Sequence, residues 1–333
     1  MRTLFYLPLI CFSLAKVPSA YAQKIQLLTS GTHSSFRGLS VVSDRIIWVS
    51  GSNGAVGRSV DGGTTWEWIT VPGYEKRDFR DIEAFDDHTA IIMAIAEPAS
   101  ILKTTDGGKT WKLVYNNTTP GMFLDAMEFA DAKLGIVLGD PVRGHLFIAN
   151  TMDGGRNWGV LSSTMPITAD SGEACFASSG TNIRIVDGVS YFITGGLRSR
   201  LFKGSQGIDL PIIQGKESTG ANSVAVQNTG NLVIVGGDFT HDTSTEKNCI
   251  LTHDAGRTWI APATPPHGYR SCVEYFGKDK LITCGTSGVD ISSDGGMNWQ
   301  LIDPGSFHVC RMAKKGKAVF LAGGGGRVAK LEL

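Results

Sequence analysis

The sequence has no excess of charge of either sign and few charged residues in total. Lysine and arginine number 31, aspartate and glutamate number 31, and charged residues make up 19% of the chain, against about 25% in an average protein. No acidic or basic tail is present, so nucleic acid and anionic membrane surfaces are not expected as main partners. The hydrophobic share of 42% excludes disorder, and no apolar run after residue 22 is long enough to cross a membrane.

Motifs for metals and cofactors are also absent. "GGGGRV" (Gly323 to Val328) lacks the third glycine of a dinucleotide fingerprint, and no cofactor is expected. No two cysteines form a C-x-x-C pair, so no metal site is predicted. Cys272 and Cys284 flank a predicted hairpin turn, which leaves open a disulfide or two buried small side chains. The cysteines after residue 22 are Cys175, Cys249, Cys272, Cys284 and Cys310.

Residues 1–22 have the features of a signal peptide. Arg2 supplies the positive charge, and an apolar run from Leu4 to Ala15 follows it. Ala20-Tyr21-Ala22 fits the A-x-A cleavage pattern. The mature chain is therefore expected to begin at Gln23 and to be secreted or periplasmic.

Glycine, by contrast, is abundant, with 42 copies, and nine of them fall in a repeated octet. "SVDGGTTW" (Ser59 to Trp66) recurs with small changes four more times, and the octets' aspartates are separated by 45, 47, 101 and 40 residues. The gap of 101 is about two periods, and "KGSQGIDL" (Lys203 to Leu210) lies midway as a decayed copy. A period of about 40–50 residues is typical of propeller blades. The aspartates are Asp61, Asp106, Asp153, Asp254 and Asp294.

Each repeat contains four short strands with turn residues between them, and no segment after residue 22 has a helical period. The octet lies between strands three and four, where its aspartate can accept backbone N–H groups and its tryptophan can pack beneath the turn. These aspartates are therefore predicted to be structural. The first strands are expected near Arg37, Arg80, Leu124, Glu173, Asn222, Arg270 and His308.

Seven blades follow from this count, but the last has only three strands of its own. "KIQLLTS" (Lys24 to Ser30) resembles a fourth strand without a blade. We therefore predict an all-β, seven-bladed propeller over residues 23–333, with its last blade completed by the N-terminal strand. Such closure protects strand edges.

The octets resemble the Asp boxes of bacterial neuraminidase (BNR) repeats, S/T-x-D-x-G-x-x-W. The chain from residue 23 is similar to the seven-bladed propellers related to the photosystem II stability and assembly factor, and to exported bacterial propellers often labelled "oxidoreductase". The phrases that carry this similarity are "LGDPV", "SGEACFASSGT", "VGGDF" and "GYRSCV". The assembly-factor resemblance implies protein binding. Sialidases carry an early Phe-Arg-Ile-Pro motif, whereas Phe36-Arg37 is followed here by Gly38-Leu39.

The strand order within a blade predicts where polar side chains gather. Strand one starts at one face, and the turn between strands two and three returns to that face, which we call the channel face. The Asp boxes lie at the opposite face. The candidate ligand-binding residues of the channel face are Arg37, Arg80, Arg143, Asn222, Tyr269, Arg270 and His308, and its acidic candidates are Asp140, Glu173 and Asp238.

Two functions fit these residues. The first is binding of a protein or glycan partner by an exported, monomeric propeller. The second is sialidase-like glycoside hydrolysis, with two of the three acidic candidates as acid and base or nucleophile. Two carboxylates about 5–10 Å apart across a pocket would favour hydrolysis, whereas carboxylates held in separate arginine pairs would favour binding. A solvated polar rim without a ligand is the simpler alternative.

Overall fold

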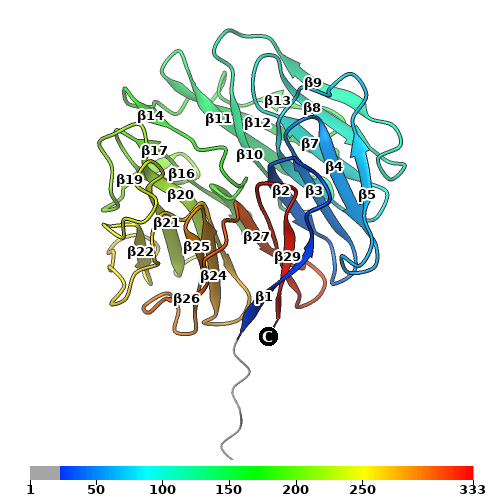
Figure 1. The fold of residues 1–333 in the computed structure, drawn as a ribbon. Helices are drawn as coiled ribbons and strands as arrows, with labels where there is room; N and C mark the ends of the chain where they lie inside the picture. Colours follow the sequence, from blue (N-terminus) through cyan, green and yellow to red (C-terminus); the bar gives the residue numbers. More distant parts are fainter. Residues whose placement is uncertain (1–22, 333) are drawn as a thin grey trace, which may run out of the picture.

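The structure is a computed structural model, and it describes residues 23–332. These residues form strands, turns and loops, with no helix among them and hence none that could cross a membrane. The strands make seven antiparallel sheets that surround a common centre (Figure 1). The predicted all-β propeller is confirmed. The predicted signal peptide lies outside the described residues.

The first three blades are built from consecutive strands. Blade 1 contains β2 (Phe36–Val41), β3 (Ile47–Gly51), β4 (Ala55–Ser59) and β5 (Glu67–Thr70). Blade 2 contains β6 (Phe79–Ala84), β7 (Ala90–Ala94), β8 (Ala99–Thr104) and β9 (Lys112–Asn117). Blade 3 contains β10 (Leu124–Phe129), β11 (Gly135–Val142), β12 (His145–Thr151) and β13 (Gly159–Val160).

The remaining blades are less uniform. Blade 4 contains β15 (Ile183–Val186), β16 (Val189–Ile193), β18 (Arg200–Lys203) and β19 (Gln206–Asp209). Blade 5 contains β20 (Thr219–Val226), β21 (Leu232–Asp238) and β22 (Cys249–Thr252), with β17 (Gly195–Gly196) and β14 (Glu173–Ala174) added beside β20. Blade 6 contains β23 (Cys272–Tyr275), β24 (Leu281–Gly285), β25 (Gly288–Ser292) and β26 (Gln300–Asp303).

Blade 7 joins the two ends of the chain. Its own strands are β27 (Val309–Met312), β28 (Val319–Ala322) and β29 (Val328–Glu332), and β1 (Lys24–Thr29) pairs antiparallel with β29. In Figure 1 the blue β1 lies beside the red β29. This confirms the predicted closure by the N-terminal strand.

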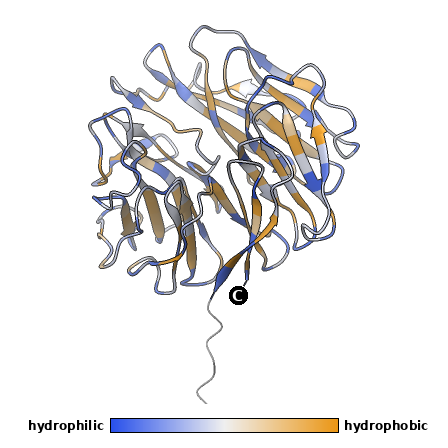
Figure 2. Ribbon diagram, viewed as in Figure 1, coloured by the Kyte–Doolittle hydropathy of each residue, from blue (hydrophilic) through white to orange (hydrophobic). Residues whose placement is uncertain are grey.

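The closing seam is also packed. Figure 2 shows apolar residues concentrated in the strands and polar residues in the connecting loops. One buried cluster spans blades 6, 7 and 1, and includes Ile282, Phe320 and Leu39. Ile25 and Leu28 of β1 pack against it, so β1 contributes apolar contacts as well as backbone pairing.

Two local expectations were wrong. Blade 4 does not start at Glu173, because its innermost strand is β15 and Glu173 lies in β14, which pairs with β17. Blade 5 lacks a regular fourth strand, since only Ile260 bridges to Leu251 of β22. Blade 4 has a decayed octet and a loop where its first strand was expected, whereas blade 5 keeps its octet but has an irregular segment in place of its fourth strand.

The Asp boxes are closed networks of short hydrogen bonds. In blade 1, Asp61 Oδ1 accepts the Thr65 N–H at 2.9 Å, and Asp61 Oδ2 accepts the Thr65 hydroxyl at 2.6 Å. Ser59 Oγ accepts the Gly63 N–H at 2.9 Å, and Trp66 Nε1 donates to the Gly63 carbonyl at 3.0 Å. These bonds, led by the Thr65 hydroxyl, lower the pKa of Asp61 to about 2. The same bonds from Thr110 lower the pKa of Asp106 in blade 2 to about 2.

Asp106→Ala is expected to lower the melting temperature by a few degrees at pH 7, since the turn loses its acceptor. The folded-state pKa lies below the ordinary value of 3.8, so the carboxylate stabilises the fold above about pH 4 and stops doing so as the pH falls through about 2. The difference in melting temperature between the variant and the parent should therefore shrink as the pH falls from about 4 to about 2. Thermal melts from pH 7 to pH 2 measure it, with Glu217→Ala as an exposed control. A constant difference at all pH values would contradict the assignment.

Candidate functional site

The two faces of the ring carry different groups. In every box the backbone N–H of a glycine, or of Ala255 in blade 5, donates to a carbonyl in the turn after the blade's first strand, as Gly62 does to Arg45 at 2.9 Å. The boxes therefore lie where the first strands end. Arg37 and Arg80 lie at the second position of β2 and β6, where those strands begin. The Asp boxes and these arginines occupy opposite faces.

Residues 175–182, which we call the crossing segment, run through the centre of the ring. The Ser178 carbonyl accepts Arg37 Nη1 at 3.2 Å, and the Gly180 carbonyl accepts Arg311 Nη2 at 3.1 Å. Ser179 Oγ donates to the Ser271 carbonyl at 2.7 Å, and Thr181 Oγ1 donates to Ser223 Oγ at 2.6 Å. The segment is thus tied to blades 1, 5, 6 and 7.

Gly180 of this segment presses against a buried carboxyl group of blade 2. A Cβ atom at Gly180 would lie 2.4 Å from the carboxylate of Asp81, and φ there is +65°. Only glycine fits this contact and this backbone conformation. Burial raises the pKa of Asp81 to about 8, against the opposing effect of Arg311 and two backbone N–H donors.

A cavity of about 380 Å³ opens above the crossing segment at the channel face, and we call it the channel-face pocket. This volume lies within the range of small-ligand pockets. Five predicted site residues line it: Arg37, Arg80, Asn222, Tyr269 and His308. Phe176, Ala177 and Ser178 of the crossing segment also line it, together with Phe239, Ser271 and Thr286.

The two arginines make the pocket electropositive. Arg80 Nε lies 2.8 Å from Asp78 Oδ2, and its side chain is 29% exposed. Arg37 donates one N–H to the Ser178 carbonyl. Burial and the neighbouring Arg80 lower the pKa of Arg37. Both guanidinium groups retain N–H donors that can bind a carboxylate or phosphate.

The other polar groups of the pocket are uncharged and oriented by one another. Tyr269 donates its hydroxyl to Asn222 Oδ1 at 2.8 Å, and burial raises the pKa of Tyr269 to about 12. His308 Nε2 lies 3.1 Å from Ser35 Oγ. Burial, followed by Arg37 and two more arginines, lowers the pKa of His308 to about 3. His308 is therefore neutral at physiological pH and does not add to the positive charge.

One wall of the pocket is aromatic. Phe176 and Phe239 meet edge to face with ring centroids 6.1 Å apart, and Phe239 meets Tyr269 in the same way at 6.2 Å. Phe239 is 47% exposed. The exposed Phe239 ring, held between the partly buried Phe176 and the buried Tyr269, offers an apolar contact surface beside the arginines.

The three acidic candidates do not line this pocket. Glu173 is fully buried against Arg200, whose Nε and Nη2 lie 2.8 and 2.5 Å from its two oxygens. Asp238 accepts the Thr240 hydroxyl at 2.6 Å and faces His241 Nδ1 at 3.1 Å. Asp140 accepts the Cys175 N–H at 2.9 Å, and burial raises the pKa of Asp140 to about 6. Each carboxylate is engaged at a different place, and arginine holds only Glu173.

Two predicted binding residues lie elsewhere. Arg143, in the turn between β11 and β12, lines a separate cavity of about 440 Å³ with Asn117 and His145. Arg270 is fully buried, and its Nε lies 2.7 Å from Asp290 Oδ2. Arg270 therefore supports the fold beneath the channel face and presents no free donor to solvent.

The sequence reasoning missed the crossing segment and Phe176, Phe239 and Ser178, which give the pocket its floor and its aromatic wall. "SGEACFASSGT" was expected to form the inner strand of blade 4. Its density of small and hydroxyl-bearing residues, which lack the apolar alternation of the other inner strands, is the signal that could have identified a loop.

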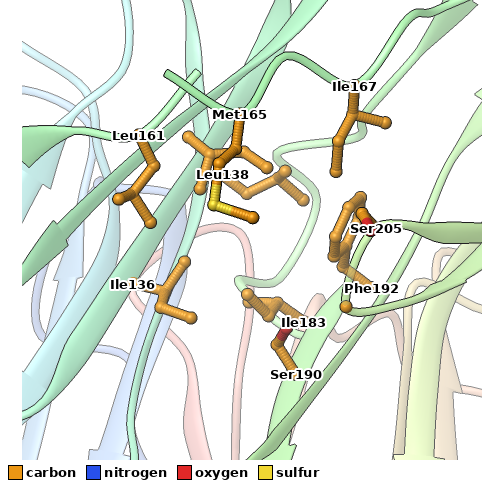
Figure 3. Close-up of a pocket in the computed structure, with 11 residues that line it drawn as sticks. Ile136, Leu138, Leu161, Met165, Ile167, Ile183, Ser190, Phe192 and Ser205 are labelled. Carbon is orange, nitrogen blue, oxygen red and sulfur yellow. The ribbon is translucent and has the colours of Figure 1, made fainter. Parts of the chain in front are cut away.

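Two further cavities lie outside the channel-face pocket. On the Asp-box side of the crossing segment, a cavity of about 320 Å³ contains three acidic and three basic residues: Glu83, Glu128, Glu274, Arg184, Arg311 and Lys314. Between blades 3 and 4, an apolar cavity of about 170 Å³ is lined by Leu138, Met165, Ile183 and their neighbours (Figure 3). The first has balanced charge, and the second is lined mostly by apolar side chains.

Seven antiparallel sheets, closed by the N-terminal strand and carrying five Asp boxes, define the chain as a seven-bladed β-propeller. Residues 17–160 match the family model of the photosynthesis system II assembly factor YCF48. This match covers 144 of the 333 residues (17 to 160), so the family model resembles the first part of the chain, and the fold of the whole is a β-propeller.

Solved structures agree with this fold. The chain is similar to YCF48 from Cyanidioschyzon merolae, with a TM-score of 0.66 and 18% identity over 93% of this chain and 99% of that one. It is also similar to a YCF48 bound to a D1 peptide, with a TM-score of 0.65 and 16% identity over 94% of this chain and 97% of that one. The Pan2 WD40 domain of Neurospora crassa matches with a TM-score of 0.61 and 11% identity over 90% and 89% of the two chains. The comparison with curated proteins gave no match.

Proposed function

We propose that this propeller binds a protein partner by taking a peptide segment into the channel-face pocket. The observation that carries the proposal is the pairing of two arginines with an aromatic wall above a closed floor. Such a pocket suits an extended segment in which a carboxylate stands next to an apolar side chain. A propeller of the same fold has been solved with a peptide bound, and this supports the choice of a protein partner.

We also propose that the protein is exported, on the strength of the sequence of residues 1–22. A partner would then be met outside the cytoplasm. Detection of a mature N-terminus at Gln23 in the exported fraction would support this. Retention of residues 1–22 in the mature protein would contradict it.

A glycan is the second candidate ligand. The exposed ring of Phe239 beside Asn222 is the observation that favours it, because sugars stack on such rings and hydrogen-bond to amides. Glycoside hydrolysis is less well supported, since it needs two carboxylates facing one pocket and none of Asp140, Glu173 and Asp238 lines this one.

Arg80→Gln and Phe239→Ala are each expected to weaken peptide binding by about tenfold or more, the loss typical of a residue at the centre of an interface. Binding is screened first on arrays of acidic and apolar peptides and of glycans, and the best probe is then titrated by calorimetry. Neither variant should change the melting temperature by more than a few degrees, because both side chains are partly exposed.

Arg143→Gln is the matched control, since Arg143 lines a different cavity. Its affinity should equal that of the parent. Equal losses in Arg143→Gln and Arg80→Gln would indicate non-specific charge attraction and would remove the pocket as the site. Binding of glycans alone would favour the second candidate.

A further inference from the structure

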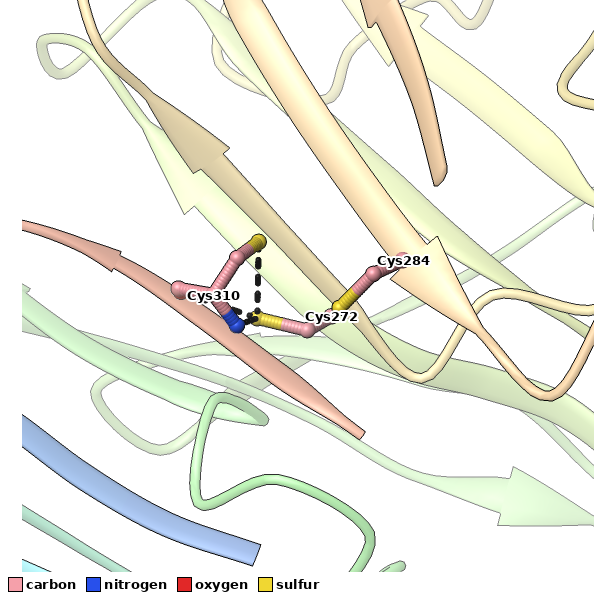
Figure 4. A group of neighbouring side chains, drawn as sticks. All are labelled: Cys272, Cys284 and Cys310. Atoms are coloured by element: carbon pink, nitrogen blue, oxygen red, sulfur yellow. Dashed lines mark hydrogen bonds between the residues drawn. The ribbon is translucent and has the colours of Figure 1, made fainter. Parts of the chain in front are cut away.

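Three buried cysteines from two blades converge on one point. Cys272 lies on β23, Cys284 on β24 and Cys310 on β27, and Figure 4 shows their side chains meeting between these strands. All three Sγ atoms lie within 4.8 Å of one another, and those of Cys272 and Cys310 are 3.6 Å apart. Each side chain is fully buried.

The cluster arises from strand register. Cys272 and Cys284 are direct partners in the β23–β24 pair, so their side chains point to the same side of the blade 6 sheet. The innermost strands of blades 6 and 7 lie next to each other, which brings Cys310 to that side. No two of the three are close in sequence, and for this reason a search for C-x-x-C spacing does not find them.

The sulfur positions suit a three-coordinate soft metal. A metal–sulfur bond of about 2.3 Å places the three sulfurs of a trigonal site about 4 Å apart, close to the spacing found here. Structural zinc sites have four ligands, and no fourth cysteine, histidine or carboxylate joins the group within residues 23–332. Thiolate ligands favour Cu(I), zinc and iron–sulfur clusters. Because structural zinc and iron–sulfur clusters take four protein ligands, Cu(I) is the one that fits three.

One backbone N–H group is placed to stabilise a bound thiolate. The backbone N–H of Cys310 points at Cys272 Sγ at a distance of 3.3 Å. The thiols are not held in a disulfide and are available as ligands. Coordination would release thiol protons to the solvent, leaving sulfur lone pairs to form the metal bonds.

We propose that Cys272, Cys284 and Cys310 form a buried Cu(I) site that links blade 6 to blade 7. The ion would join the innermost strand of blade 7 to blade 6, and so would hold in place the blade that also contains the two chain ends. The site is sealed from solvent, so the metal enters during folding or when the two blades transiently separate. This site is independent of the channel-face pocket.

The test uses the full mature chain, refolded without oxygen in the presence of one equivalent of Cu(I) and then desalted. The expected result is one copper ion per chain, a first shell containing only sulfur in X-ray absorption, and a higher melting temperature than that of the copper-free protein. Absence of retained copper after desalting would overturn the proposal, as would a first shell containing nitrogen or oxygen.

Cys310→Ser removes one ligand, and it should retain Cu(I) at least about tenfold more weakly in competition with bathocuproine disulfonate. Cys249→Ser is the matched control, because Cys249 is equally buried but stands outside the cluster. It should bind copper as the parent does. If Cys310→Ser does not fold, Cys284→Ser serves instead. Equal retention by the ligand variants and the control would place the copper elsewhere and overturn the proposal.

Discussion

Arg270→Met is expected to lower the free energy of unfolding by about 3–5 kcal/mol, because it leaves a buried carboxylate without its main partner. The side chains of Arg270 and Asp290 are both fully buried. Arg270 also donates to the Tyr269 carbonyl and to Ser287 Oγ, each at 2.8 Å. After the substitution only His267, whose Nδ1 lies 2.6 Å from Asp290 Oδ1, remains beside the carboxylate.

Urea unfolding followed by tryptophan fluorescence measures the loss. The double variant Arg270→Met/Asp290→Asn is the matched control, since it removes both charges and should be more stable than Arg270→Met alone. If the free energy of unfolding of Arg270→Met lies within about 1 kcal/mol of the parent's, the ion pair between Arg270 and Asp290 does not stabilise the fold.

Removal of residues 23–31 is expected to lower the melting temperature by roughly 10 °C and to promote self-association. The deletion takes away β1 and with it the pairing of Leu27 with Ala329 and the apolar contacts of Ile25 and Leu28. Partial burial of two large aliphatic side chains contributes a few kcal/mol. The freed edge of β29 becomes a template for pairing with another chain.

Thermal melts and size-exclusion chromatography compare a chain that begins at Gln23 and keeps β1 with a chain that begins at Thr32 and lacks it. Lys24→Ala is the control within β1, because Lys24 forms only an exposed ion pair with Glu332 and such pairs contribute little. Its melting temperature should match the parent's. A shortened chain that melts like the parent and elutes as one compact species would show that the ring does not depend on β1.

The architecture was predictable because it depends on local chemistry that repeats. Ser59 and Asp61 make the same contacts as their counterparts in the other four boxes, so one motif predicts five turns. The bond from Trp66 to a glycine carbonyl recurs at Trp111 and Trp299. The unmatched segment Lys24 to Ser30 and the incomplete last repeat together predicted the closure. Arg37 and Arg80 could be assigned to one face from strand order alone.

What could not be predicted depends on contacts between residues far apart in the chain. From the sequence, Glu173 was expected to be an exposed acid at the start of a strand. In the structure it lies in the added strand β14, which pairs with β17, and it is buried against Arg200. Glu173→Gln therefore tests folding rather than ligand binding. Arg270 comes directly after Tyr269 in the sequence. Its side chain does not line the pocket, because it binds Asp290 on β25 in the interior. Sequence spacing carries no information about either partner.

The crossing segment determines how anything can enter or leave the ring. Its bonds to four blades, and the contact of Gly180 with Asp81 on a fifth, separate the arginine-lined cavity from the charged cavity beyond it. The central channel of the propeller is therefore closed in its interior and open at the channel face. A bound segment therefore does not thread through the ring, and it must enter and leave the pocket at the channel face.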